Sequence, residues 1–310
     1  MSTFLDSSDR TERGGPSRTA TGHRSLRDKQ GNAPWRTIKN RLCTGLLTVA
    51  MALGMLPLAL IIGYTAYRGA GVLDVGFFVE NEPPWRRDGG GYAAGFFGTA
   101  YIMLHAILYS VPLGIATAIY LVEYGGGKLA MAIRFFTDVM TGIPSIFVGL
   151  FVYGLLIGAL GFGTFPAAVA IAIIMLPIIT RSAEEMLKLV PDEWRNASRA
   201  LGAGKATTIV RTVLPAAAPG LATGSMLAIA RGIGETAPLI LTALGSQVVV
   251  TAFTDAAQSA IPLQVYRGIN QPFEAGIERA WGGALSLFLL VLIMVILARW
   301  IGSRTTKRRG

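Results

Sequence analysis

RSAEEMLKLVPDEWRNASRALGAGKATTIVRTVLPA, residues 181–216, is the longest charged segment that lies between two apolar runs of this chain. Its apolar side chains recur at helical spacing, at Leu187, Val190, Trp194, Ala197 and Leu201. Pro191 with Asp192 can start a helix, and the glycines of 202–204 can end it. We predict a short helix, a glycine turn and a second helix that ends at Pro215, which together form a compact lobe. A solvated loop is the alternative, but a mere connection rarely carries so regular an apolar stripe.

The runs on both sides of this segment, and the other long apolar runs, are long enough to cross a membrane. A hydrocarbon core of about 30 Å needs about 17–25 apolar residues in a helix. Six runs meet this length: 42–67, 93–122, 141–160, 164–180, 220–244 and 284–301, with an amphipathic approach to the third from Lys128. The sequence therefore predicts an all-α integral membrane protein with six transmembrane helices.

Composition supports this class and excludes others. Of the 310 residues, 52% are hydrophobic and only 15% are charged, and the mean hydropathy is +0.51. A soluble domain carries about 25% charged residues. These values exclude a disordered chain, a disulfide-rich miniprotein and an ordinary cytosolic enzyme. The single cysteine, Cys43, excludes an internal disulfide, and with two histidines we expect no metal site.

The net charge of +10 comes mainly from basic residues that flank the apolar runs. A nucleic-acid-binding protein gathers such residues on a folded face, so we expect no nucleic-acid partner. Under the positive-inside rule, both termini, the 123–134 loop and 181–216 face the cytoplasm. Residues 1–40 and 304–310 are predicted to be basic cytoplasmic tails, the first of them disordered, and 41–303 form the membrane domain.

Two charged residues lie inside the fifth apolar run, in the sequence ARGIGETAPLILTALG. Arg231 and Glu235 are four residues apart, hence on one face of a helix. A charge at mid-bilayer costs about 2.5–3.5 kcal/mol on insertion scales, and such residues mark pathways or pair with each other. The pair could pin helices together. Alternatively, it forms an anion site, because the planar fork of arginine donors suits phosphate oxygens and Glu235 could orient the guanidinium or accept a proton.

At these residues the sequence resembles a known family. The cytosolic loop of ABC importer permeases has a motif that is matched here at Ala197, Gly202, Leu214 and Pro215, and departed from at Asn196, Ser198 and Thr212. The run Gly232, Gly234, Glu235, Thr236, Ala237, Pro238 resembles the signature of the PstA-type permeases of bacterial phosphate ABC importers. A further patch typical of that family is Gly142, Ile143, Pro144, Ser145, Ile146. The resemblance covers about residues 40 to 303.

This resemblance implies the type I ABC importer permease fold in the bacterial inner membrane, with an activity that belongs to a larger complex. The chain would form the phosphate path with a homologous PstC-type permease. A PstB-type ATPase dimer would bind ATP and Mg²⁺, and a PstS-type protein would deliver phosphate. The chain itself would be no enzyme and hold no cofactor, in keeping with the absence of a complete P-loop motif.

These sequence patterns, together with the resemblance, predict roles for individual residues. We expect the substrate path at Arg231, Glu235, Thr236, Ser145 and Arg181, and coupling to the ATPase at Asn196, Ala197, Ala200, Leu201, Gly202 and Ala203. For Ser145 the alternative is a plain kink at Pro144, and for Arg181 it is a positive-inside anchor. For the chain, the alternatives are an importer of sulfate or molybdate and a self-sufficient secondary anion transporter. A secondary transporter needs no coupling helix, so the 181–216 segment favours the importer.

Overall fold

The computed structural model describes residues 33–84 and 86–307, and this part of the chain is helical, with a single isolated bridge pair between Leu244 and Gln258. The longer helices are α1 (Ala33–Gly69), α3 (Ala93–Ile119), α4 (Lys128–Gly142), α7 (Thr164–Lys188), α10 (Leu214–Ile233) and α13 (Glu274–Lys307). The shorter ones are α2 (Val75–Val79), α5 (Ser145–Val152), α6 (Gly158–Leu160), α8 (Asp192–Ala200), α9 (Lys205–Thr208), α11 (Ala237–Thr242) and α12 (Ile261–Ile269). A 3₁₀ turn, η1 (Ala70–Val72), and three π-helical turns complete the set: η2 (Tyr120–Tyr124), η3 (Tyr153–Ile157) and η4 (Ile209–Val213).

The six predicted runs correspond to five or six candidate membrane spans. Within the described residues, five helices are long and apolar enough to cross a bilayer. The sixth candidate is the pair Lys128–Gly142 and Ser145–Leu160, which is bent by 107° and forms either a broken span or a re-entrant loop. The third predicted run, 141–160, is therefore interrupted near its start, because α4, which forms the predicted approach from Lys128, ends at Gly142 and α5 begins at Ser145. Proline cannot continue a helix and also disfavours helical geometry in the residue before it.

The fifth predicted span, 220–244, also has the wrong bounds. Helical structure begins earlier, at Lys205, and α10 ends at Ile233, so that residues 234–236 separate it from α11. The predicted helix end at Pro215 is wrong for the same reason, since this proline lies in the first turn of α10. This proline follows closely on the π-helical turn η4, where the regular pattern of backbone hydrogen bonds is already interrupted. The last span starts earlier than predicted, at Glu274.

The chain divides into two compact units between Ala59 and Leu60, so the N-terminal helix α1 belongs partly to each of them. The part of α1 that begins at Ala33 lies in the first unit. Residues 33–40 are therefore helical, whereas the sequence predicted that they belong to a disordered tail. Residues 1–32, the rest of that predicted tail, lie outside the described residues. In the second unit, the end of α1 packs on α13, where the rings of Tyr64 and Trp281 meet edge to face at 5.2 Å.

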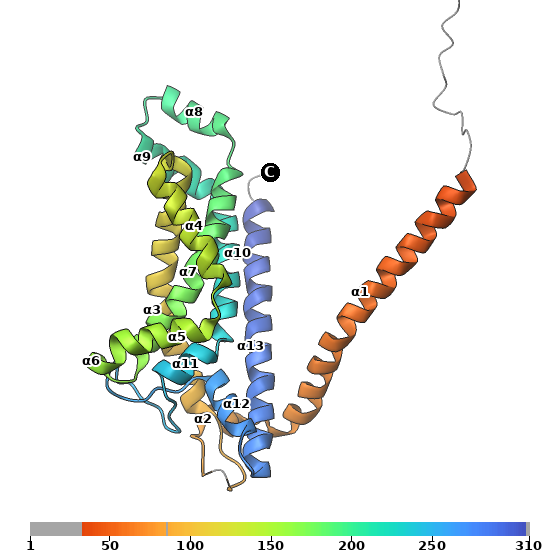
Figure 1. Cartoon of the computed structure of the whole chain (residues 1–310), viewed down its shortest axis with the longest axis vertical. Helices are drawn as coiled ribbons and strands as arrows, with labels where there is room; N and C mark the ends of the chain where they lie inside the picture. Colours follow the sequence, from red (N-terminus) through yellow and green to blue (C-terminus); the bar gives the residue numbers. More distant parts are fainter. Residues whose placement is uncertain (1–32, 85, 308–310) are drawn as a thin grey trace, which may run out of the picture. The chain divides into compact units, whose positions relative to one another are not determined.

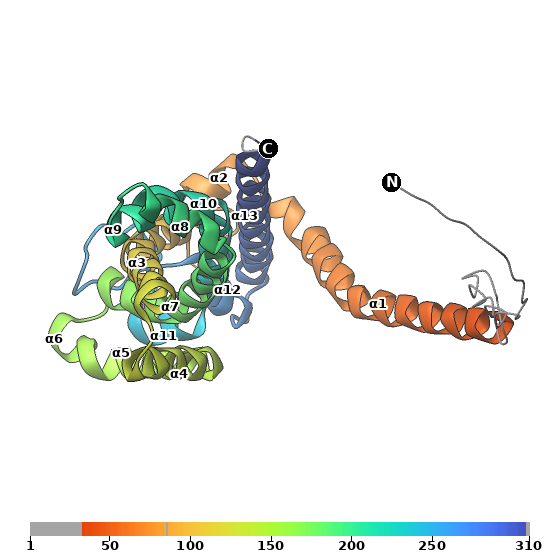
Figure 2. The same ribbon diagram turned by 90° about the horizontal axis from the view of Figure 1, so that it is seen from above.

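The core of the second unit lies between α3, α7 and α10. Buried Ile102, Ile171 and Ile229 represent the three helices in the largest apolar cluster. Small residues allow close approach: a Cβ on Gly114 of α3 would lie 2.7 Å from a methyl carbon of Ile179 on α7. Seen along the bundle in Figure 2, α3, α7 and α10 lie together, with α13 on one side and α4 on another.

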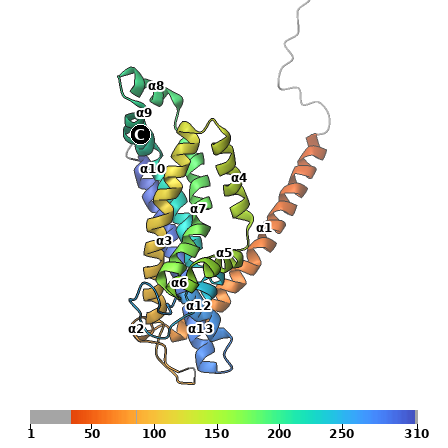
Figure 3. The same ribbon diagram turned by 60° about the vertical axis from the view of Figure 1, so that its left-hand side comes forward.

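The two ends of this bundle carry different elements. Helices α8 and α9 and the last turns of α13 lie at one end, whereas α2 and α12 lie at the other (Figure 1). Helix α4 runs beside α7, and α5 then turns to pack on α11 (Figure 3). The α5–α11 contact is tight, because a Cβ on Gly149 would lie 2.6 Å from the Cα of Pro238. The helix after the bend at 143–144 thus packs on the helix that follows the break after α10.

Candidate functional site

Arg231 and Glu235 form an ion pair at the end of α10. The Nε atom of Arg231 lies 3.5 Å from Oε1 of Glu235. The prediction that one continuous helix carries both residues is wrong, since Arg231 occupies the last turn of α10 and Glu235 lies in the break before α11. The Arg231 side chain is 62% exposed and that of Glu235 is 15% exposed. The guanidinium therefore has donors left for another partner, while the carboxylate is largely enclosed.

Arg231 lines a cavity together with Ser145, the first residue of α5. The cavity has a volume of about 360 Å³ and lies between α4, α5, α7 and α10. Its polar lining is Arg231, Ser145 and Thr141, and its other walls are apolar, including Phe147 and Pro177. A cationic donor beside two hydroxyls in an apolar enclosure can attract an oxyanion and strip part of its water. Glu235 and Thr236 lie in or beside the break and are not part of this lining.

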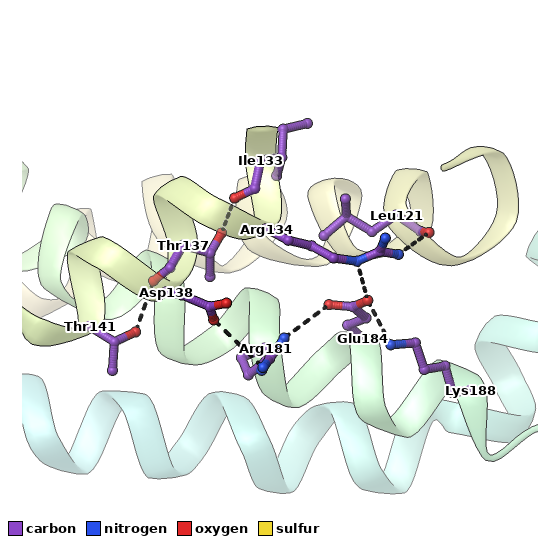
Figure 4. Close-up of polar contacts among 9 residues, drawn as sticks. All are labelled: Leu121, Ile133, Arg134, Thr137, Asp138, Thr141, Arg181, Glu184 and Lys188. Atoms are coloured by element: carbon purple, nitrogen blue, oxygen red, sulfur yellow. Dashed lines mark hydrogen bonds and ion pairs between the residues drawn. The ribbon is translucent and has the colours of Figure 1, made fainter. Parts of the chain in front are cut away.

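Arg181 is separate from this cavity and belongs to a charged cluster between α4 and α7 (Figure 4). Its Nη2 lies 3.6 Å from Oδ1 of Asp138, and its Nη1 lies 3.8 Å from Oε2 of Glu184. Glu184 is 2% exposed and accepts hydrogen bonds from Nε of Arg134 at 2.9 Å and Nζ of Lys188 at 2.7 Å. The cluster holds α4 against α7, which the sequence reasoning missed because Arg134 and Glu184 are 50 residues apart.

The segment predicted to couple to an ATPase is a smaller lobe than 181–216. Helix α7 continues to Lys188, so the protruding part consists of 189–204, with α8 at its centre. Asn196, Ala197 and Ala200 lie on α8, and Leu201, Gly202 and Ala203 form the turn after it. Gly202 has φ +83°, the left-handed conformation that favours glycine.

The apolar stripe predicted for this segment divides into two parts. Leu187 and Val190 are buried in a second apolar cluster, whereas Trp194 is 51% exposed and Leu201 is 90% exposed. The buried residue of α8 is instead Arg195, which sequence reasoning did not single out. The exposed apolar side chains of the lobe are therefore available to a partner.

A second polar cluster lies at the opposite end of the bundle, near α2 and α12. Nε2 of Gln264 donates to Oε2 of Glu82 at 3.2 Å, and the Tyr92 hydroxyl donates to the Gln264 carbonyl at 3.4 Å. Burial raises the pKa of Glu82, although the hydrogen bond from Gln264 and the charges of Arg279 and Arg267 oppose the shift. The folded state thus favours the protonated carboxyl, so this group lowers stability as the pH rises from its ordinary pKa through the raised one. The sequence indicated only a loop charge at Glu82.

Comparisons with known proteins agree with this architecture. The family described as "Binding-protein-dependent transport system inner membrane component" matches residues 110–307. The chain is 39% identical over 280 residues to phosphate transport system permease protein PstA 1 of Mycobacterium tuberculosis, which covers 88% of this chain and 92% of that protein. It is also 39% identical over 284 residues to PstA of Yersinia pestis, with 91% of this chain and 95% of that protein covered.

Solved structures show the same fold at low sequence identity. A bacterial alginate ABC transporter chain aligns with a TM-score of 0.58 at 16% identity, over 89% of this chain and 99% of that one. A chain of the MetNI methionine ABC transporter aligns with a TM-score of 0.52 at 18% identity, over 70% of this chain and 94% of that one. At such identities the likeness concerns the helix arrangement alone.

Proposed function

Because the chain belongs to the PstA family of phosphate transport permeases, we propose that it is the membrane-spanning permease subunit of an ATP-driven inorganic phosphate importer. The observation that carries this function is the match to PstA chains over about nine-tenths of the sequence, with the six-span fold of importer permeases. The chain works as a transport subunit in a cell membrane.

The cavity supports our proposal for the substrate path. Arg231 supplies the charged donors, and Ser145, which also lines the cavity, supplies a hydroxyl. Glu235 neutralises Arg231 while no anion is bound, and Thr236 follows in the same break. Arg181 guides the anion at the inner mouth, since half of its side chain is exposed. We expect a phosphate to compete with Glu235 for the guanidinium, because the ion-pair distance of 3.5 Å is long for a charge-assisted bond.

We infer the partners from the same family membership. A homologous PstC-type permease completes the path, and a PstS-type protein delivers phosphate at the α2–α12 end. A PstB-type ATPase dimer binds ATP and Mg²⁺ and docks on the turn after α8. The exposed Leu201 and the left-handed Gly202 support a contact there. Hydrolysis thus takes place in a separate subunit.

Uptake measurements test the function. In cells that lack the gene, this chain restores uptake of radiolabelled phosphate when the ATPase is present and fails to do so without it. Uptake that persists without the ATPase would identify a secondary transporter. Uptake of sulfate or molybdate in place of phosphate would change the assigned substrate.

The orientation in the membrane is a separate prediction. The lobe 189–204, which carries Arg195 and Arg199, and the last turns of α13 lie at one end of the bundle, which supports a cytoplasmic position for that end (Figure 1). With six spans, the N-terminus then lies on the same side. Reporter fusions at Arg86 and Lys205 will report opposite sides, with Lys205 in the cytoplasm. If both fusions report the same side, this topology is wrong.

A further inference from the structure

Arg195 attaches α8 to the rest of the protein. Its residue is 8% exposed, although its neighbours on α8 are largely exposed. Its Nη2 donates to the Leu187 carbonyl at 2.9 Å, and its Nη1 donates to the Val190 carbonyl. The Leu187 carbonyl lies in the last turn of α7 and the Val190 carbonyl lies two residues beyond its end, where the dipole end of the helix is negative. One guanidinium therefore joins α8 to α7.

The same guanidinium reaches α3 through Glu123. Its Nε donates to Oε1 of Glu123 at 3.0 Å, and the two side chains are 9% and 5% exposed. Glu123 lies in η2, the π-helical turn that ends α3. A buried ion pair is screened much less than an exposed one. Asp192, which also faces Nη1 at 3.2 Å, is 87% exposed and contributes far less.

Two further contacts complete the attachment of the lobe. Nζ of Lys205 lies 4.1 Å from the ring centroid of Tyr124, the neighbour of Glu123 in η2. The Ser198 and Thr208 hydroxyls are 3.1 Å apart and connect α8 to the segment after the glycine turn. Both flanks of the turn thus converge on η2. Since α3 and α7 are tightly packed where Gly114 meets Ile179, they can move together.

We propose that Arg195 is the positioning residue that transmits displacements of α8 to α3 and α7. This inference rests on the proposed coupling of α8 to an ATPase. Without the guanidinium, α8 keeps its backbone connection to α7 through 189–191 and the contact between Ser198 and Thr208, but its side-chain links to Glu123 and to the end of α7 are lost. The ATPase then still docks and hydrolyses ATP, but the membrane helices follow its movement poorly.

The test is the ratio of phosphate transported to ATP hydrolysed by the complete importer in proteoliposomes. Arg195→Lys keeps the charge but loses the fork of donors, and Glu123→Gln keeps the shape but loses the buried charge. Each lowers the ratio about tenfold, as expected when charge-assisted hydrogen bonds are lost. The matched control is Asp192→Asn, which removes the exposed partner of the same arginine and leaves the ratio near the wild-type value.

Three outcomes would overturn the proposal. One is an unchanged ratio of phosphate transported to ATP hydrolysed in Arg195→Lys and Glu123→Gln. This holds even if less complex assembles, because the arginine then serves folding alone. Another is an equal loss in Asp192→Asn. The third concerns the distance between spin labels at positions Glu193 and Gly126, measured in a Cys43→Ser background. The proposal is wrong if the distribution of this distance is as narrow in Arg195→Lys as in the protein that keeps Arg195. Transport by the wild-type complex tests the proposed function separately. If this complex does not transport phosphate, the proposed function is wrong.

Discussion

Replacing Arg231 by lysine lowers phosphate uptake per assembled complex about tenfold, because lysine keeps the charge but loses the bidentate fork. The amount of complex stays near the wild-type level, since the Arg231 side chain is 62% exposed and its ion pair with Glu235 is long. Uptake of radiolabelled phosphate, normalised to the purified complex, measures the effect. The matched control is Arg211→Lys, an exposed arginine of the same continuous helical span, which leaves uptake unchanged.

The double change Arg231→Leu with Glu235→Leu separates transport from helix packing. If the pair only pins the end of α10 to the break that follows it, the single changes lower the amount of complex. The double change then restores both the amount and the uptake. If the pair serves the substrate, the double variant assembles but does not transport. Full uptake in the double variant would therefore refute the proposed role of Arg231. Glu235→Gln, which leaves Arg231 without its neutralising charge, either retains phosphate or misassembles the complex.

The fold could be predicted from the sequence to the extent that it depends on apolar length. Six apolar runs in a weakly charged chain predicted six spans, and the described residues contain five candidate spans and one bent helix pair. The errors fall at Pro144 and at Gly234, where hydropathy continues but the helix does not. Hydropathy reports which residues avoid water. It does not report where the backbone turns within the membrane, which depends on packing such as Gly149 against Pro238.

The candidate site was predictable only where its partners are close in the sequence. Arg231 and Glu235 are four residues apart, and their spacing alone indicated a pair, which the structure contains. Arg195 and Glu123 are 72 residues apart, and no local pattern connects them. Apolar periodicity also predicts the wrong buried side chains for α8. The buried residue of this helix is charged, and its apolar residues are exposed.

Replacing Gly202 by proline abolishes crosslinking between the lobe and the ATPase, while the chain still inserts in the membrane. Gly202 has φ +83°, whereas proline fixes φ near −65°. Proline also removes the amide that donates to the Arg199 carbonyl at 2.9 Å and closes the turn after α8. The turn therefore opens, and Leu201 and Ala203 leave their positions at the docking surface. Single cysteines at Ala200 or Ala203, in a Cys43→Ser background, provide the crosslinking sites.

Alanine substitutions test whether the turn after α8 requires the left-handed backbone of glycine or only the space that a missing side chain leaves. A Cβ at Gly202 or at Gly204 would meet no atom within 4 Å, so neither site is sterically limited. Only Gly202 is left-handed, since Gly204 has φ −67°. The left-handed conformation costs an L-residue about 1–2 kcal/mol, so Gly202→Ala weakens crosslinking and uptake about tenfold. Gly204→Ala, the matched control, leaves both unchanged. Equal effects of the two alanine variants, or normal crosslinking in Gly202→Pro, would show that the ATPase does not depend on this turn.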